Sequence, residues 1–171
     1  MKAPFPFIPW NTSALWREVN AGFAHLLRAK KTALADTRQL ADQLHASMAS
    51  LFPLLNDLCA ITCTTCSDIC CQRAYVWIDF KDLLFLHMTD IPVPGAQLLS
   101  ARGEHCRYCG QHGCRLERIQ RPFVCTLYLC PAQTLRLRED PTVMHATTEA
   151  LQRIKRTRQA METAFIRALM A

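Results

Sequence analysis

Ten cysteines, all in the middle of a chain of 171 residues, are the side chains best able to do chemistry in this sequence. Apart from Cys59 they form three blocks, which hold Cys63, Cys66, Cys70 and Cys71, then Cys106, Cys109 and Cys114, then Cys125 and Cys130. The first two blocks each contain a C-x-x-C pair, in which two sulfurs can bind one metal ion while backbone N–H groups point at them. The pattern predicts a sulfur-rich metal site, and soft thiolates exclude magnesium and calcium as its natural occupants.

We expect a soluble, cytoplasmic protein without a membrane partner. Pro4, Pro6 and Pro9 interrupt the short apolar N-terminus, which argues against a signal peptide. No stretch approaches the roughly 18 apolar residues of a membrane span. Thiols stay reduced in the cytoplasm and are free to bind metal. Because ten is an even number, a framework of disulfides is the competing interpretation.

The order of the cysteines resembles that of the YkgJ-type cysteine-cluster family. The likeness rests on the first block, on Cys106 followed by Tyr108, on the dipeptide Arg121-Pro122, and on the two last cysteines. That family is described as a zinc- or iron-chelating domain with eight characteristic cysteines. The resemblance covers residues 63–131 and implies a set of eight metal ligands, namely Cys63, Cys66, Cys70, Cys71, Cys106, Cys114, Cys125 and Cys130.

The spacing does not decide between zinc and iron. Eight sulfurs make two tetrahedral zinc sites of four ligands each. An iron–sulfur cluster of the 4Fe-4S type also uses four cysteines, often in a C-x-x-C-x-x-C run with a distant Cys-Pro. Cys63, Cys66 and Cys70 nearly supply that run, and Cys130 precedes Pro131. Some relatives of the family are flagellin lysine methylases associated with an iron–sulfur centre, which keeps an enzymatic role open.

Four further residues of this segment carry separate expectations. Cys109 is an additional candidate ligand or a spare thiol. Arg121 is expected beside the ligands, because a guanidinium group stabilises a cluster of thiolates, whereas Arg118 is expected to be solvated. Cys59 follows an apolar stretch and is expected to pack as a small hydrophobic residue, so that its loss would leave the metal content unchanged.

Long helices are predicted on both sides of the cysteines. Apolar residues recur at helical spacing over residues 12–52, with a break near Lys30–Thr32 and a boundary at Pro53. The same period runs over residues 141–171, where Pro141 opens the helix.

The segment between them has little periodic pattern. Asp79–His87 is expected as a short helix, Gln97–Ala101 as a further helical turn, and Ala74–Ile78 as a β-type run. Hydrophobic residues make up 50% of the chain, which is enough for one core. We predict one mainly α domain over residues 1–171, in which the two terminal helical segments pack together and flank an irregular, cysteine-rich, metal-binding core at 59–131.

Three functions fit these features. The first is a metal-binding protein with a structural, redox or accessory role, the second an iron–sulfur-dependent modifying enzyme, and the third a zinc-stabilised module whose terminal helices bind a protein partner. No catalytic residue is predicted, and the sequence does not decide whether the protein is an enzyme. The net charge of +6 does not demand a nucleic acid. The basic run Arg153, Lys155, Arg156 and Arg158 lacks interleaved aromatic residues and is expected to form a solvated face.

Overall fold

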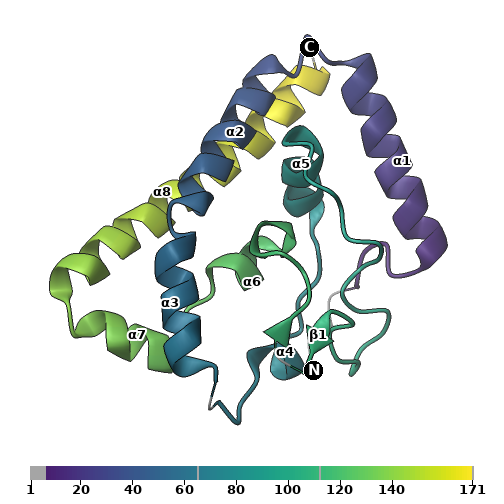
Figure 1. Cartoon of the computed structure of the whole chain (residues 1–171). Coiled ribbons are helices and arrows are strands. Elements are labelled where there is room, and N and C mark those ends of the chain that lie inside the picture. Colours follow the sequence, from purple (N-terminus) through teal and green to yellow (C-terminus); the bar gives the residue numbers. More distant parts are fainter. Residues whose placement is uncertain (1–6, 65, 112, 171) are drawn as a thin grey trace, which may run out of the picture.

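A computed structural model describes residues 7–64, 66–111 and 113–170, with the side chains of Cys71 and Arg73 outside that description. Helices dominate these residues, as predicted (Figure 1). The elements in chain order are α1 (Ser13–Ala29), α2 (Ala35–Ala49), α3 (Phe52–Thr62), α4 (Cys70–Arg73), α5 (Phe80–Met88), β1 (Cys109–Gly110), β2 (Gly113–Cys114), the 3-10 helix η1 (Arg118–Gln120), α6 (Phe123–Leu127), α7 (Pro131–Arg138) and α8 (Pro141–Met170).

The N-terminal helical segment is divided where the sequence predicted. α1 begins after Thr12, whose hydroxyl accepts a hydrogen bond from the Leu15 N–H at 3.2 Å. The chain leaves the helix between Ala29 and Ala35, and Pro53 lies in the first turn of α3, where the missing N–H costs no hydrogen bond. The predicted break and the predicted boundary are both confirmed.

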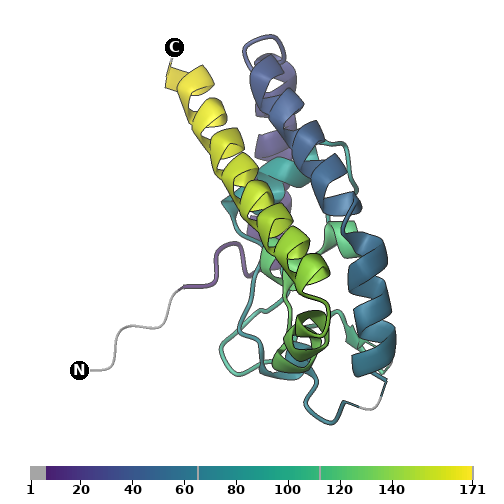
Figure 2. The same ribbon diagram turned by 90° about the vertical axis from the view of Figure 1, so that its left-hand side faces the viewer.

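The core is built where α8 packs along α2 (Figure 2). Ile154 and Met161 of α8 and Ala41 of α2 have no exposed surface, and Leu44 of α2 is 1% exposed. Pro141 opens α8 as predicted, and the Asp140 carboxylate accepts hydrogen bonds from two N–H groups of its first turn. The C-terminal helix therefore pairs with part of the N-terminal helical segment, as expected.

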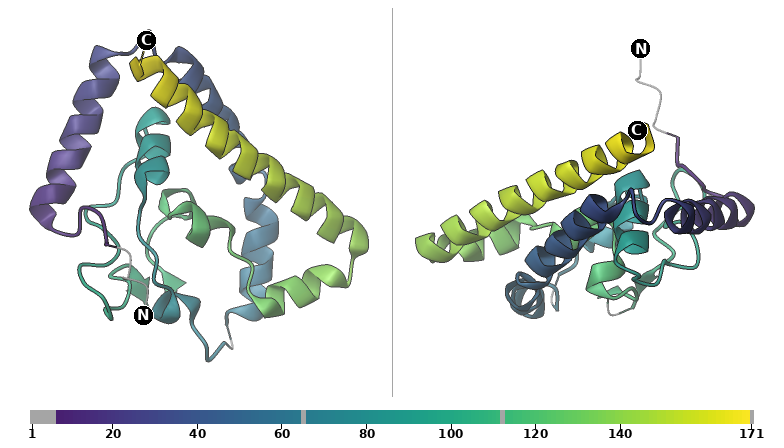
Figure 3. Two further views of the ribbon diagram at one scale, coloured as in Figure 1. Left: turned by 180° about the vertical axis from the view of Figure 1, so that it is seen from behind. Right: turned by 90° about the horizontal axis from the view of Figure 1, so that it is seen from above.

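Aromatic rings connect α1 and α5 to this pair of helices. The rings of Phe23 and Phe80 lie 5.6 Å apart, and those of Phe80 and Phe165 lie 5.6 Å apart. Such tilted and edge-to-face pairs stabilise a core beyond the apolar area that they bury. In Figure 3, α1 lies on one side of the molecule, α2 and α8 lie on the other, and α5 lies between them.

The middle of the chain confirms one predicted helix and corrects another. α5 begins at Asp79, which forms a capping box with Asp82. The predicted helical turn at Gln97–Ala101 is wrong, because these residues form bends and irregular backbone. The expected β-type run at 74–78 forms no strand, and among the described residues only β1 and β2 pair in a sheet. No single described helix has the length and apolarity to cross a membrane. α2 and α3 have that length and apolarity only when they are taken together across the bend between them.

Candidate metal centre

The cysteines come from four parts of the chain that meet at the end of the molecule opposite the C-terminus. In Figures 1 and 3, α4, β1 and the facing ends of α3 and α7 all lie at this end. α3 and the loop after it carry Cys59, Cys63 and Cys66, and α4 begins with Cys70. The hairpin and the loop before it carry Cys106, Cys109 and Cys114. Cys125 lies on α6, and Cys130 is the residue before α7.

Three of these residues, Cys59, Cys63 and Cys130, form a group that we call the helix-end thiols. Cys59 lies one turn before Cys63 on α3, so both side chains occupy one face of the helix. Cys130 caps α7, whose N-terminus faces this end of α3. Burial raises the pKa of the Cys63 thiol, and the neighbouring Cys59 and Cys130 add to that rise.

A single buried residue, Gln133 of α7, contacts all three sulfurs of this group. Its side-chain amide donates to Cys59 Sγ at 3.4 Å and to Cys63 Sγ at 3.9 Å. Its backbone N–H donates to Cys130 Sγ at 3.5 Å, and its side-chain oxygen accepts from the Cys130 N–H. Only 4% of the Gln133 surface is exposed, so the residue is held in place.

Four other residues, Cys70, Cys106, Cys114 and Cys125, form a second group that we call the loop thiols. The first three lie within electrostatic reach of the half-buried Cys125, whose thiol pKa is raised to about 12. Burial is the main cause, and Cys106, Cys114, the carboxylate of Asp82 and Cys70 each raise this pKa further. α4 and the hairpin segment therefore each bring thiols within electrostatic reach of Cys125 on α6.

The second C-x-x-C turn has the geometry that its spacing predicted. The backbone N–H groups of Tyr108 and Cys109 donate to the Cys106 sulfur and lower its pKa, although burial raises that pKa overall. Cys109 pairs with Cys114 across the two-stranded hairpin. Cys109 therefore lies beside the loop thiols, consistent with an extra ligand or a spare thiol.

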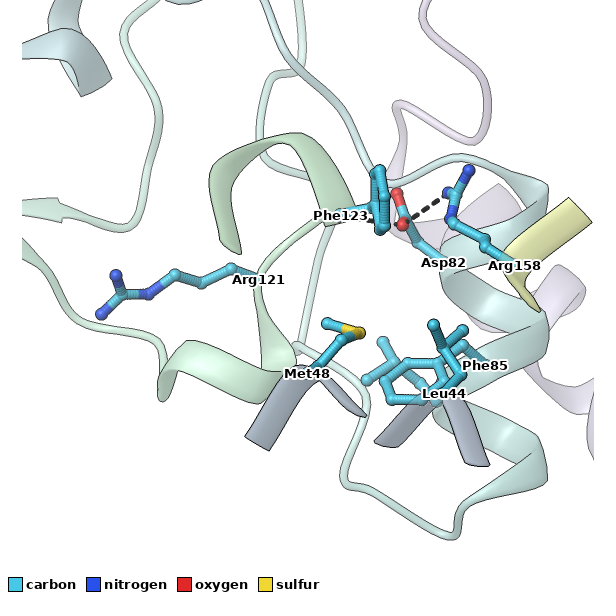
Figure 4. Close-up of a pocket in the computed structure, with 8 residues that line it drawn as sticks. Leu44, Met48, Asp82, Phe85, Arg121, Phe123 and Arg158 are labelled. Carbon is cyan, nitrogen blue, oxygen red and sulfur yellow. Dashed lines mark hydrogen bonds and ion pairs between the residues drawn. The ribbon is translucent and has the colours of Figure 1, made fainter. Parts of the chain in front are cut away.

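A buried ion pair supports the helix that carries Cys125. Arg158 contacts Asp82 at 2.7 Å and Asp79 at 2.6 Å, and Figure 4 shows it against the Phe123 ring, 4.7 Å from the centroid. Asp82 also accepts a hydrogen bond from the Phe123 N–H at the start of α6. Arg158 is thus not part of the solvated face that the sequence predicted, whereas Arg153, Lys155 and Arg156 are exposed.

The expectation that Arg118 is solvated is wrong, because packing between α3 and α6 buries part of its side chain and supplies hydrogen-bond partners. Arg118 is half-buried and donates to Cys59 Sγ at 3.4 Å. Arg121 donates to the Leu116 carbonyl, and its guanidinium group points away from the pocket drawn in Figure 4. A role for Arg121 next to metal ligands stays a prediction, and Arg118 is the arginine that contacts a sulfur.

The eight ligands implied by the family resemblance do not form one group. Cys63 and Cys130 belong to the helix-end thiols, whereas Cys70, Cys106, Cys114 and Cys125 are the loop thiols. Cys66 donates to the Asp68 carbonyl at 3.4 Å, and the Cys71 side chain lies outside the described residues. Among the side chains that the structure describes, no three His, Cys, Asp or Glu residues surround a common point as metal ligands would.

Comparison with known proteins does not add to this set of residues. Scans against protein-family models, curated proteins and solved structures found no match to this chain. The likeness to the YkgJ-type family therefore rests on the order of the cysteines and stays a prediction.

Sequence reasoning missed Cys59 as a member of the helix-end thiols and Gln133 as the residue that contacts them. Cys59 could have been recognised, because a spacing of four residues places it on the same helix face as Cys63. Gln133 gives no signal in the sequence, since its contacts depend on how α7 packs against α3.

Proposed function

We propose that this protein binds zinc or iron through its cysteines. The observation that carries the proposal is that α4 and the hairpin segment bring three thiols, Cys70, Cys106 and Cys114, within electrostatic reach of Cys125 on α6. Four thiols are the usual ligand set both of a tetrahedral zinc ion and of an iron–sulfur cluster. The residues that would hold the metal are Cys70, Cys106, Cys114 and Cys125.

A metal at the loop thiols has to displace their protons, which burial holds at Cys106 and Cys125. The backbone N–H groups at Cys106 stabilise a negatively charged sulfur. A divalent ion favours deprotonated thiols even where burial alone keeps them protonated. Metal affinity should therefore rise with pH as the thiol protons become easier to displace.

A structural role for the metal follows from the segment that it would join. Residues 89–108 contain no helix or strand, and the hairpin after them has strands of two residues. A segment of this kind has few backbone hydrogen bonds of its own, and metal ligation contributes folding free energy on the order of 10 kcal/mol. We infer that the metal stabilises this segment, and a redox or accessory role would use the same ligands.

The test is metal and acid-labile sulfide analysis, with a visible spectrum, of protein purified without oxygen. We expect bound zinc or iron in the wild type, reduced content in Cys125→Ser, and wild-type content in the control Val124→Ser, which alters the exposed neighbour of Cys125 on α6. Wild-type protein that holds no metal and takes up neither Zn²⁺ nor Co²⁺ would overturn the proposal.

The same analysis separates the two other candidate functions. Iron with acid-labile sulfide and visible colour would favour the modifying enzyme. Colourless protein with zinc would favour the interaction module, in which the metal holds a binding surface in shape.

A further inference from the structure

We propose that the helix-end thiols, Cys59, Cys63 and Cys130, form a second metal site, separate from the loop thiols, with three protein ligands and one position left for an external ligand. This inference deepens the proposed function and rests on it. It makes Cys59 a ligand, contrary to the expectation that this residue only fills space in the core.

The first support is that one residue, Gln133, donates hydrogen bonds to all three sulfurs. The Gln133 side chain donates to both α3 thiols, and its backbone N–H donates to the thiol that caps α7. N–H donors directed at sulfur stabilise the thiolate form, which is the form that binds metal. An apolar environment for Cys59 would contain no such donors.

The second support is the charge of Arg118. Its guanidinium group is fixed by the Asn56 side chain at 2.9 Å and by the Thr126 carbonyl at 3.2 Å, and it donates to the Cys59 sulfur. No described carboxylate forms an ion pair with this half-buried cation. A metal-bound sulfur at Cys59 carries negative charge, which this cation would balance.

The third support is the accessibility of the group. Cys63 ends α3 and is exposed, whereas Cys59 and Cys130 are half-buried. The three sulfurs do not surround a common point in the structure, so an ion that joins them requires the Cys63 side chain to turn toward Cys130, which the end of a helix permits. Three protein ligands with one open position are typical of zinc sites at which a water or another ligand exchanges.

The open position depends on Cys66 staying outside the site. Cys66 follows Cys63 by three residues, but its thiol donates to the Asp68 carbonyl and is exposed. A site with Cys66 as fourth ligand would be closed and structural, so Cys66→Ser decides between the two forms.

The experiment is an anaerobic titration of the reduced full-length chain with Co²⁺, followed by its thiolate charge-transfer absorption. We expect about two equivalents in the wild type, about one in Cys59→Ser, about one in Cys125→Ser and none in the double variant. Ala60→Ser is the matched control, because it places the same side chain at an exposed position of α3 without removing a thiol. Circular dichroism of each variant shows that the helices are retained.

The outcomes separate this inference from the proposed function. If the wild type binds about one equivalent and Cys125→Ser abolishes it while Cys59→Ser does not, the second site is overturned and the proposed function stands. If the wild type binds none, both fail. Loss of the second equivalent in Cys66→Ser would overturn the open position, and a Cys59–Cys63 disulfide in protein isolated without oxygen would overturn the site.

Gln133 provides an independent test as a positioning residue. Gln133→Met keeps the side-chain length but removes the amide donors, so Co²⁺ affinity at this site should fall about 10–100-fold. The affinity of the loop thiols should stay unchanged, which a general loss of structure would not allow. Equal weakening of both sites, or of neither, would contradict the role of Gln133.

Discussion

At the scale of single residues, Arg158 connects the long helix α8 to the helix that carries Cys125. Its side chain is 12% exposed, and its guanidinium group contacts two carboxylates, one of which also accepts from the first N–H of α6. A buried charge without a partner is far more costly than a buried pair. The position of α6, and with it that of Cys125, therefore depends on this pair.

Arg158→Met should lower the free energy of unfolding by about 3–5 kcal/mol, because Asp82 would remain buried without its partner. Urea unfolding followed by circular dichroism measures this loss. Arg156→Met is the matched control, since Arg156 is exposed on the same helix and should change stability by no more than about 0.5 kcal/mol. Equal effects of the two substitutions would show that the ion pair does not hold the fold.

The pair also predicts how stability depends on pH. Burial raises the pKa of Asp82 from 3.8 to about 6, with the Asp79 charge adding to the rise. The folded protein therefore binds a proton at this site more tightly than the unfolded chain does. Between about pH 4 and pH 6 the contribution of Asp82 to the free energy of unfolding should fall as pH rises, and above pH 6 it should be constant.

The Asp82→Asn variant isolates this contribution, because the asparagine does not titrate. Subtracting its unfolding free energy from that of the wild type at each pH should leave a curve that falls from pH 4 to pH 6. A difference curve that rises over this interval would mean that Arg158 lowers the pKa of Asp82 more than burial raises it.

At the scale of elements, Gln97 holds the irregular segment that leads to the hairpin. Its side-chain oxygen accepts from the N–H groups of Ile78 and Leu98, and its amide donates to the carbonyls of Ile78 and Pro9. Only 1% of its surface is exposed. One side chain thereby forms hydrogen bonds with backbone groups that, in a sheet, would bond to a neighbouring strand.

Gln97→Met should lower the free energy of unfolding by about 3 kcal/mol or more, because each buried group that loses its partner costs about 1–3 kcal/mol. Thermal and urea unfolding check this value. Gln152→Met is the control, since Gln152 is exposed on α8. A loss of under about 1 kcal/mol in Gln97→Met would mean that water replaces these hydrogen bonds.

The elements that the sequence predicted are those with a long periodic pattern or a clear cap. The helices over residues 12–52, the helix after Asp79 and the helix from Pro141 were all recognisable on these grounds. α6 and α7 have five and eight residues, too few for the period to show, and the tertiary contacts decide their conformation. The cysteines themselves were evident, but their division into two groups depends on how α3 meets α7, which no local pattern encodes.

At the scale of the whole molecule, metal removal should destabilise the segments that carry the loop thiols and leave the α2–α8 pair folded. The α2–α8 pair buries Leu44, Ile154 and Met161 almost completely and needs no ligand. The loop thiols join segments with few backbone hydrogen bonds of their own, so the proposed metal supplies much of their stability.

Hydrogen exchange measured by mass spectrometry, before and after chelation, tests this division. Amides of residues 104–127 should exchange faster after the metal is removed, whereas those of α2 and α8 should keep their protection. In Cys125→Ser the chelator should have little further effect on residues 104–127, because the loop thiols have already lost a ligand. Faster exchange throughout α2 and α8 would instead mean that the metal and the helical core unfold as one cooperative unit, and the cysteine-bearing end would then be part of what holds the long helices together.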